Sequence, residues 1–243
     1  LNYLEKEFKK KFNIKNAKIT SIWCQNYNLS KKVSKACNIK NPVRNYKDML
    51  NNVDAVIIAR DDWKSHIKLS SFFIRNKIKV FIDKPLTLSK KELIFFSKYL
   101  KSKLIMSCSA LRFSKEFKKN KNLKVNEIRL FTVNDFNKYT IHMLEFAYVM
   151  GFKKILKINN NKNDLNFLTQ KGKVNICLSN KNKYHYAELY YKNNFIKKIK
   201  FDDSFFMFKE TLKNFINFCK NKKTYSYKDT INIIENLINL KNK

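Results

Sequence analysis

The 243-residue sequence predicts an α/β protein with two domains: a doubly wound parallel sheet in residues 1–110, then an α+β domain with a largely antiparallel sheet in residues 111–243. Two observations lead to this fold class. Segments typical of strands and of helices alternate up to about residue 110, which is the pattern of a parallel sheet covered by helices. Beyond Arg112, three strand-like segments follow one another without an intervening helix, and the helical segments lie at the ends.

The predicted strands of the first domain are short apolar runs at residues 18–24, 53–59, 79–82 and 104–108. The run at 53–59 is nearly all apolar and therefore predicts a strand buried on both faces. The predicted helices have apolar residues at helical spacing or a capping residue at their start. They are an amphipathic helix with Tyr3, Leu4, Phe8 and Phe12 on one face, two short helices capped by Ser30 and Asn45, a helix at residues 66–75, and a helix after the capping box of Ser89 and Glu92.

The second domain is predicted to begin with a strand at residues 126–133 and a helix at residues 141–150, which Gly151 ends. Further strands are predicted at residues 166–169, 173–178, 184–191 and 195–201. Two helices close the chain, with apolar residues at helical spacing between Phe205 and Cys219 and between Ile231 and Ile238.

Composition limits the classes of function. At 44% hydrophobic residues the chain is too apolar to be disordered. Its net charge of +33 suggests a nucleic-acid partner, but 47 of the 52 basic residues are Lys, and Arg is the side chain that reads phosphates and guanines with two hydrogen bonds. The basic residues are also spread along the whole chain. We therefore interpret the charge as a property of the surface and predict no specific nucleic-acid partner; a basic nucleic-acid-binding protein remains an alternative.

The chain has only two glycines, Gly151 and Gly172, so no glycine-rich phosphate loop lies within these 243 residues. Its five cysteines are odd in number and widely spaced, which is typical of reduced thiols and favours a cytoplasmic location. No apolar run is long enough for a membrane span, and neither a membrane partner nor a metal site is predicted.

Polar residues follow two neighbouring predicted strands, at the edge where open parallel sheets bind ligands. They are Arg60, Asp61, Asp62 and His66 after the strand at 53–59, and Asp83, Lys84 and Pro85 after the strand at 79–82. Desolvation at a cleft edge would lower the pKa of Lys84 into a range useful for proton transfer. The alternative is that Asp83-Lys84-Pro85 is only a strand-to-turn connection and that His66 is a structural histidine at a helix entry.

These residues also resemble a known family. VDAVIIARDDWKSH and KIKVFIDKPL, within residues 53–86, are similar to the strand and Lys-Pro motifs of the glucose–fructose oxidoreductase / inositol dehydrogenase (Gfo/Idh/MocA) family. The resemblance continues in SALRFSKEFKK (109–119), HMLEFAYVMG (142–151) and YSYKDTINIIENLI (225–238), so it covers most of the chain in the family's order. It implies a Rossmann-type first domain and an NAD(P)-dependent oxidoreductase acting on a sugar, cyclitol or sugar nucleotide, in a homo-oligomer.

The resemblance also implies roles. Lys84 would hydrogen-bond the substrate and the nicotinamide ribose, and His142 would be the acid/base on the substrate hydroxyl. The cofactor, NAD or NADP, would be bound by Arg60, Asp61, Asp62, His66, Asp83, Lys84, Pro85 and Arg112.

The sequence departs from the family pattern at three places. Lys138 stands where the family has an Asp four residues before the histidine, which leaves Asp135 or Glu145 to orient His142. Cys24-Gln25 replaces the acidic residue expected to hold the adenosine ribose, so the choice between NAD and NADP stays open. We also expect the chain to begin inside the family's first helix, as an incomplete Rossmann-type domain that binds cofactor weakly. A degenerate, non-catalytic relative that acts as a binding protein is therefore the alternative function.

Overall fold

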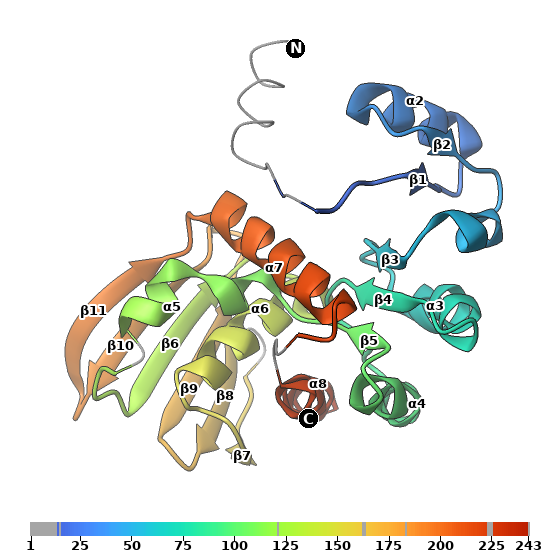
Figure 1. The fold of residues 1–243 in the computed structure, drawn as a ribbon. Helices are drawn as coiled ribbons and strands as arrows, with labels where there is room; N and C mark the ends of the chain where they lie inside the picture. The colour runs from blue at the N-terminus through green and yellow to red at the C-terminus, as the bar shows by residue number, and fades with distance from the viewer. Residues whose placement is uncertain are drawn as a thin grey trace.

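The computed structural model describes residues 14, 16–120, 122–161, 164–182, 184–222 and 226–242. The helix predicted around Tyr3–Phe12 lies outside them. The described chain has the predicted α/β architecture, with small parallel sheets on one side of the molecule and a six-stranded sheet on the other (Figure 1).

The parallel strands form two separate sheets. One pairs β1 with β2, and the other has the order β3-β4-β5. Their bounds are Ser21–Ile22, Asn41–Pro42, Ala55–Ile58, Lys79–Ile82 and Ile105–Met106. Between them lie α2 (Tyr27–Cys37), the 3-10 helices η1 (Tyr46–Asn52) and η2 (Trp63–Ser65), α3 (His66–Arg75) and α4 (Lys90–Lys101). The predicted parallel pairing is confirmed, but most of the strands are shorter than predicted.

Two helix starts show how capping decides boundaries. The prediction that Ser30 caps a helix is wrong: α2 begins earlier, with Asn26 as its cap, and the fully buried Ser30 hydroxyl accepts a hydrogen bond from the Cys24 backbone N–H at 2.8 Å. Asn45 is a cap as predicted, since its side chain accepts from the Lys47 N–H at 3.1 Å, although the helix that follows is 3-10.

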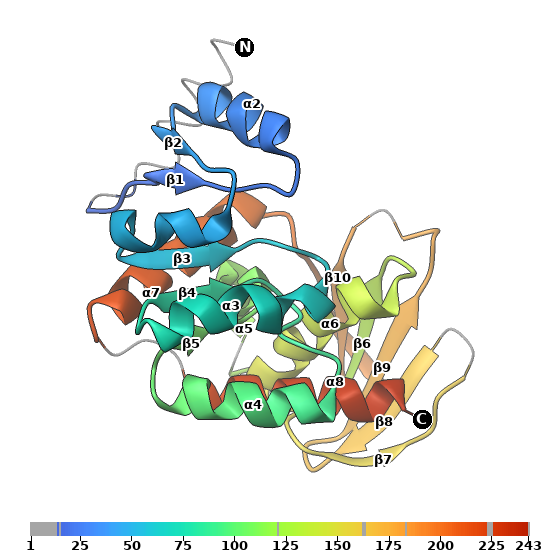
Figure 2. The same ribbon diagram turned by 90° about the vertical axis from the view of Figure 1, so that its right-hand side faces the viewer.

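The expectation that residues 53–59 form a strand buried on both faces is wrong at Ile57, which is 43% exposed. Val56 and Ile58 face α3 and are buried, because side chains alternate along a strand. The opposite face is covered by α7 (Ser204–Cys219), which packs on Phe81 of β4 through Phe215 and leaves Ile57 at the margin. Figure 2 shows α3 and α4 toward the viewer and α7 behind the strands.

The second sheet has the order β11-β10-β6-β9-β8-β7, and only β6 and β9 are parallel. Its strands are β6 (Glu127–Thr132), β7 (Ile155–Ile158), β8 (Asp164–Thr169), β9 (Lys173–Leu178), β10 (Tyr186–Tyr191) and β11 (Asn194–Lys200). Alternate residues such as Ile128, Ile176 and Leu189 have no exposed surface and pack against helices. The predicted, largely antiparallel sheet is confirmed.

The helices that remain are α5 (Lys115–Asn120), which follows the 3-10 turn η3 (Ala110–Phe113), α6 (Phe136–Val149) and α8 (Tyr227–Lys241). Of these, α6 packs on β6 and β9 of this sheet. Gly151, with φ of +96°, follows the end of α6 as predicted, and α8 lies between α4 and α6. No helix in the described part of the chain has the length and apolarity to cross a membrane.

Candidate active site

The site lies where the carboxyl ends of β3 and β4 meet α6 and the start of β10. Asp61 follows β3, Lys84 follows β4, and Lys138 and His142 lie on α6. Asp61 joins the two lysines: its Oδ1 is 3.4 Å from Lys84 Nζ and its Oδ2 is 2.7 Å from Lys138 Nζ. The hydrogen bond from Lys138, with the Lys84 ammonium, holds the pKa of Asp61 below its usual range. An ion-paired carboxylate therefore bridges the parallel sheet and α6.

Lys84 is held in place by the strand that precedes it. The Asp83 backbone N–H donates to the Ile58 carbonyl at 3.0 Å, which continues the pairing of β4 with β3 into the turn. Burial raises the pKa of the Asp83 carboxyl. The Lys84 side chain is only 12% exposed, so its ammonium emerges at a fixed point at the edge of the sheet.

The neutral imidazole of His142 lies near the Lys84 ammonium. Its Nδ1 lies 2.6 Å from the Ser109 hydroxyl. Burial, together with the nearby Lys84 ammonium, lowers the pKa of His142 to about 3. Its Nε2 has no hydrogen-bond partner among the described residues. A half-buried, uncharged imidazole near an ammonium group can accept a proton from a ligand hydroxyl placed between them.

The residue that orients His142 is neither of those suggested by the sequence. Asp135 caps α6 and accepts from the Lys138 N–H, while both oxygens of Glu145 are bound by other groups. Ser109 orients the ring instead. A hydroxyl contact between residues 33 positions apart leaves no pattern in the sequence.

Two further site residues were missed by the sequence analysis. His185, immediately before β10, has its ring centroid 5.5 Å from that of His142, and Tyr139 of α6 lies 5.4 Å from His185. His185 Nδ1 is 2.8 Å from the Thr132 hydroxyl, and burial with the Lys84 charge lowers its pKa. The only signal available was that His185 is one of three histidines in the chain.

The residues predicted after β3 fall into two groups. Asp61 contacts Lys84, as described, whereas His66 has no exposed surface. The His66 ring nitrogens lie 3.1 Å from the Arg60 carbonyl and 3.0 Å from the Leu86 carbonyl. His66 thus ties the loop after β3 to the loop after β4, and both of its ring nitrogens are used in these contacts. Asp62 lies 3.6 Å from the Arg60 guanidinium.

Arg112 lies behind His142 in a buried ion pair. Its Nε and Nη2 donate to the Glu145 carboxylate at 2.6 and 2.9 Å, and Glu145 also accepts from the Ser109 N–H at 3.0 Å. The Arg112 and Glu145 side chains are 8% and 2% exposed. This network fixes η3 against α6 and so positions the Ser109 hydroxyl that holds His142.

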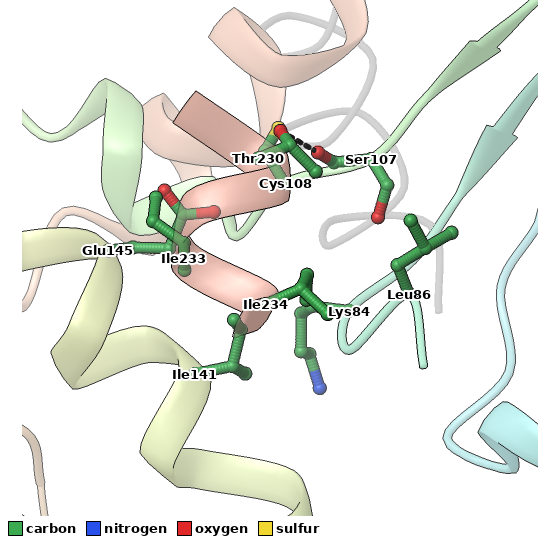
Figure 3. Close-up of a pocket in the computed structure, with 9 residues that line it drawn as sticks. All are labelled: Lys84, Leu86, Ser107, Cys108, Ile141, Glu145, Thr230, Ile233 and Ile234. Atoms are coloured by element: carbon green, nitrogen blue, oxygen red, sulfur yellow. Dashed lines mark hydrogen bonds between the residues drawn. The ribbon is translucent and has the colours of Figure 1, made fainter. Parts of the chain in front are cut away.

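A small interior cavity lies beneath the site (Figure 3). It is lined by Lys84, Leu86, Ser107, Cys108, Ile141, Glu145, Thr230, Ile233 and Ile234. Lys84 contributes its aliphatic stem, while its ammonium points away from Glu145, and Thr230 donates to the Ser107 carbonyl at 2.9 Å. Burial raises the pKa of the Cys108 thiol to about 12, so it stays protonated. The cavity belongs to the packing that supports Lys84.

The donor set at the sheet edge fits the ribose ends of a nicotinamide dinucleotide. Lys84 and Asp61 offer an ammonium donor and a carboxylate acceptor, the pair that binds vicinal hydroxyls. The buried Nε of Arg60 has no hydrogen-bond partner in the described part of the chain, so a donor there is available to a ligand. Lys84 and Asp61 would hold the nicotinamide ribose, and Arg60 would lie toward the rest of the cofactor.

Part of the chain matches a known family of oxidoreductases. Residues 2–104 match the family model GFO_IDH_MocA, described as "Oxidoreductase family, NAD-binding Rossmann fold". No curated protein matches the chain.

Solved structures share the fold at low identity. Scyllo-inositol dehydrogenase from Lactobacillus casei, with bound NAD(H) and scyllo-inositol, has a TM-score of 0.77 at 13% identity, covering 100% of this chain and 94% of that one. Myo-inositol 2-dehydrogenase from Lactobacillus plantarum gives 0.77 at 13% identity over 98% and 93%. A probable dehydrogenase from Thermotoga maritima gives 0.72 at 16% identity over 91% and 88%. Residues 2–104 thus match the NAD-binding domain of the Gfo/Idh/MocA oxidoreductase family, and over the described residues the chain has the fold of these dehydrogenases.

Proposed function

We propose that the protein is an NAD(P)-dependent oxidoreductase that transfers a hydride between the nicotinamide and a carbon bearing a hydroxyl or carbonyl group in a sugar, cyclitol or sugar nucleotide. One observation carries the proposal: Asp61 ties Lys84, at the end of β4, to Lys138 of α6, one turn before His142, so the Lys84 ammonium lies near enough to this neutral imidazole to lower its pKa. Hydride transfer from an alcohol needs a base for the hydroxyl proton next to the site where the hydride leaves, and this arrangement supplies it.

Each side chain has a separate part. When bound, the nicotinamide accepts or supplies the hydride. His142 takes the proton from the substrate hydroxyl and returns it in the reverse direction. Lys84 donates hydrogen bonds to the substrate oxygen and stabilises the negative charge that develops there. Asp61, 3.4 Å from Lys84 Nζ, keeps that ammonium directed into the site.

Turnover with a panel of cyclitols, aldoses and sugar nucleotides, followed as reduced cofactor, tests the proposal. We expect turnover with at least one compound. His142→Asn should lower kcat by about 100-fold or more, the range for loss of a general acid/base. Lys84→Met should lower kcat similarly, whereas Lys213→Met, which removes an exposed lysine of α7, should change it less than about twofold.

The non-catalytic alternative rests on Lys138. Its ammonium lies 2.7 Å from Asp61, where a carboxylate was expected from the family pattern. If the protein binds cofactor and polyol but oxidises none of the panel, it is a binding protein and the oxidoreductase proposal is wrong. Turnover that is unchanged by both Lys84→Met and His142→Asn would contradict the site assignment.

A further inference from the structure

The carboxyl edge of β1 and β2 gathers basic and aromatic side chains. These strands are parallel, and the Val43 N–H donates to the Ile22 carbonyl at 2.9 Å, so the residues that follow both strands meet at one edge. The Trp23 indole N–H donates to the Arg44 carbonyl at 3.2 Å. The Arg44 guanidinium lies 4.3 Å from the centroid of the Tyr27 ring, which fixes its position by cation–π attraction.

The charge at this edge is positive. Lys31 Nζ lies 5.2 Å from the centroid of the same Tyr27 ring, so two cations lie against one aromatic ring. Residues 23–27 and 43–47 contain no acidic side chain, and Arg44 has no carboxylate partner within the described residues. The first turn of α2, capped by Asn26, adds the positive end of a helix dipole at the same place.

In Rossmann folds, the side chain after the second strand decides between the two nicotinamide cofactors. An acidic residue there binds the ribose 2′-hydroxyl of NAD and repels a phosphate, whereas a nearby Arg accommodates the 2′-phosphate of NADP. Guanidinium binds phosphate with two parallel, charge-assisted hydrogen bonds. Here Cys24-Gln25 follows β1, where that acidic residue was expected, and Arg44 follows the paired strand β2.

We infer that Arg44, supported by Tyr27 and Lys31, forms a subsite for the 2′-phosphate and that the protein uses NADP in preference to NAD. The inference rests on the proposed function, because it assigns the adenosine end of the same cofactor site. It concerns binding alone and does not depend on the identity of the sugar-like substrate.

The test uses the adenosine half of the cofactor and a ligand control matched in charge. With a net charge of +33, any doubly phosphorylated nucleotide will bind to some extent. Isothermal titration should therefore compare adenosine 2′,5′-bisphosphate with adenosine 3′,5′-bisphosphate, which carries the same groups with one phosphate on the wrong hydroxyl. We expect the 2′,5′ isomer to bind about tenfold or more tightly, as one bidentate contact allows.

Three variants test whether Arg44 causes the preference for the 2′,5′ isomer. Arg44→Ala should abolish it, and Gln25→Glu should weaken binding of the 2′,5′ isomer by placing a carboxylate beside the phosphate. Arg75→Ala removes another exposed arginine, in the last turn of α3 and at the opposite end of the strands, and should leave the preference unchanged. Circular dichroism confirms that each variant is folded.

Equal affinities for the two isomers, no detectable binding of either, or a preference that survives Arg44→Ala would overturn the inference. The proposed function is tested separately. Turnover with NAD but not with NADP would support the proposed oxidoreductase function and contradict the role given to Arg44. A preference for the 2′,5′ isomer without turnover of any substrate would support the phosphate subsite at Arg44 and contradict the proposed oxidoreductase function.

Discussion

At the scale of single residues, His142 links stability to pH. Burial and the Lys84 charge lower its pKa to about 3, so between pH 3 and its ordinary pKa near 6.5 the unfolded chain binds a proton that the folded chain does not. The contribution of His142 to the free energy of unfolding is therefore fully present above pH 6.5 and falls by about 1.4 kcal/mol per pH unit as the pH drops through this window.

Urea denaturation at pH 7 and pH 5 measures this effect. The wild type should lose about 2 kcal/mol through His142 between the two conditions. His142→Asn, which cannot titrate, should lose correspondingly less, while the contributions of His185 and the carboxylates cancel in the comparison. The same loss in both proteins would show that the His142 imidazole is not held neutral.

A second prediction at the scale of residues concerns the ion pair between Arg112 and Glu145. Glu145→Gln leaves the guanidinium buried without its charge partner and should lower the free energy of unfolding by about 3–5 kcal/mol. The control is Glu210→Gln, which removes one carboxylate from an exposed pair with Lys213 and should cost less than about 1 kcal/mol. Similar losses in the two variants would argue against a buried network behind His142.

At the scale of elements, the turn between β8 and β9 depends on Gly172. Its φ is +147°, and a Cβ there would lie 1.8 Å from the Asn126 carbonyl oxygen, which accepts the Lys173 N–H. Gly172→Ala must displace the start of β6 and should cost more than about 2 kcal/mol by urea denaturation.

Gly151→Ala is the matched control, since Gly151 also has a positive φ. The nearest atom to its Cβ would be the flexible Lys171 Cδ at 3.1 Å, so the cost should be the backbone strain alone, about 1–2 kcal/mol. An equal or larger loss at Gly151 would contradict the role given to the Asn126 contact.

The elements also show what local patterns can predict. Neighbouring residues are enough to predict the alternation of strands and helices and the cap at Asn45, and both predictions are confirmed. The exposure of Ile57 and the shortening of the strand predicted at 18–24 depend on which neighbours cover or pair with those strands. Such contacts come from distant parts of the chain and leave no local signal.

At the scale of the whole molecule, some residues of the candidate site could be predicted to lie together from the sequence and others could not. Lys84 and Asp61 could be predicted to lie together because they follow adjacent parallel strands. Ser109, His185 and Tyr139 could not, because they come from three elements that only the packing of α6 between the two sheets brings together.

The central claim is that a nicotinamide ring lies against Lys84 and His142. Saturation-transfer difference NMR with NADPH measures it directly and is suited to weak binding. The account predicts saturation of the nicotinamide ring protons, lost in Lys84→Met and retained in the exposed-lysine control Lys213→Met. Saturation confined to the adenine protons, or nicotinamide signals unchanged by Lys84→Met, would contradict it.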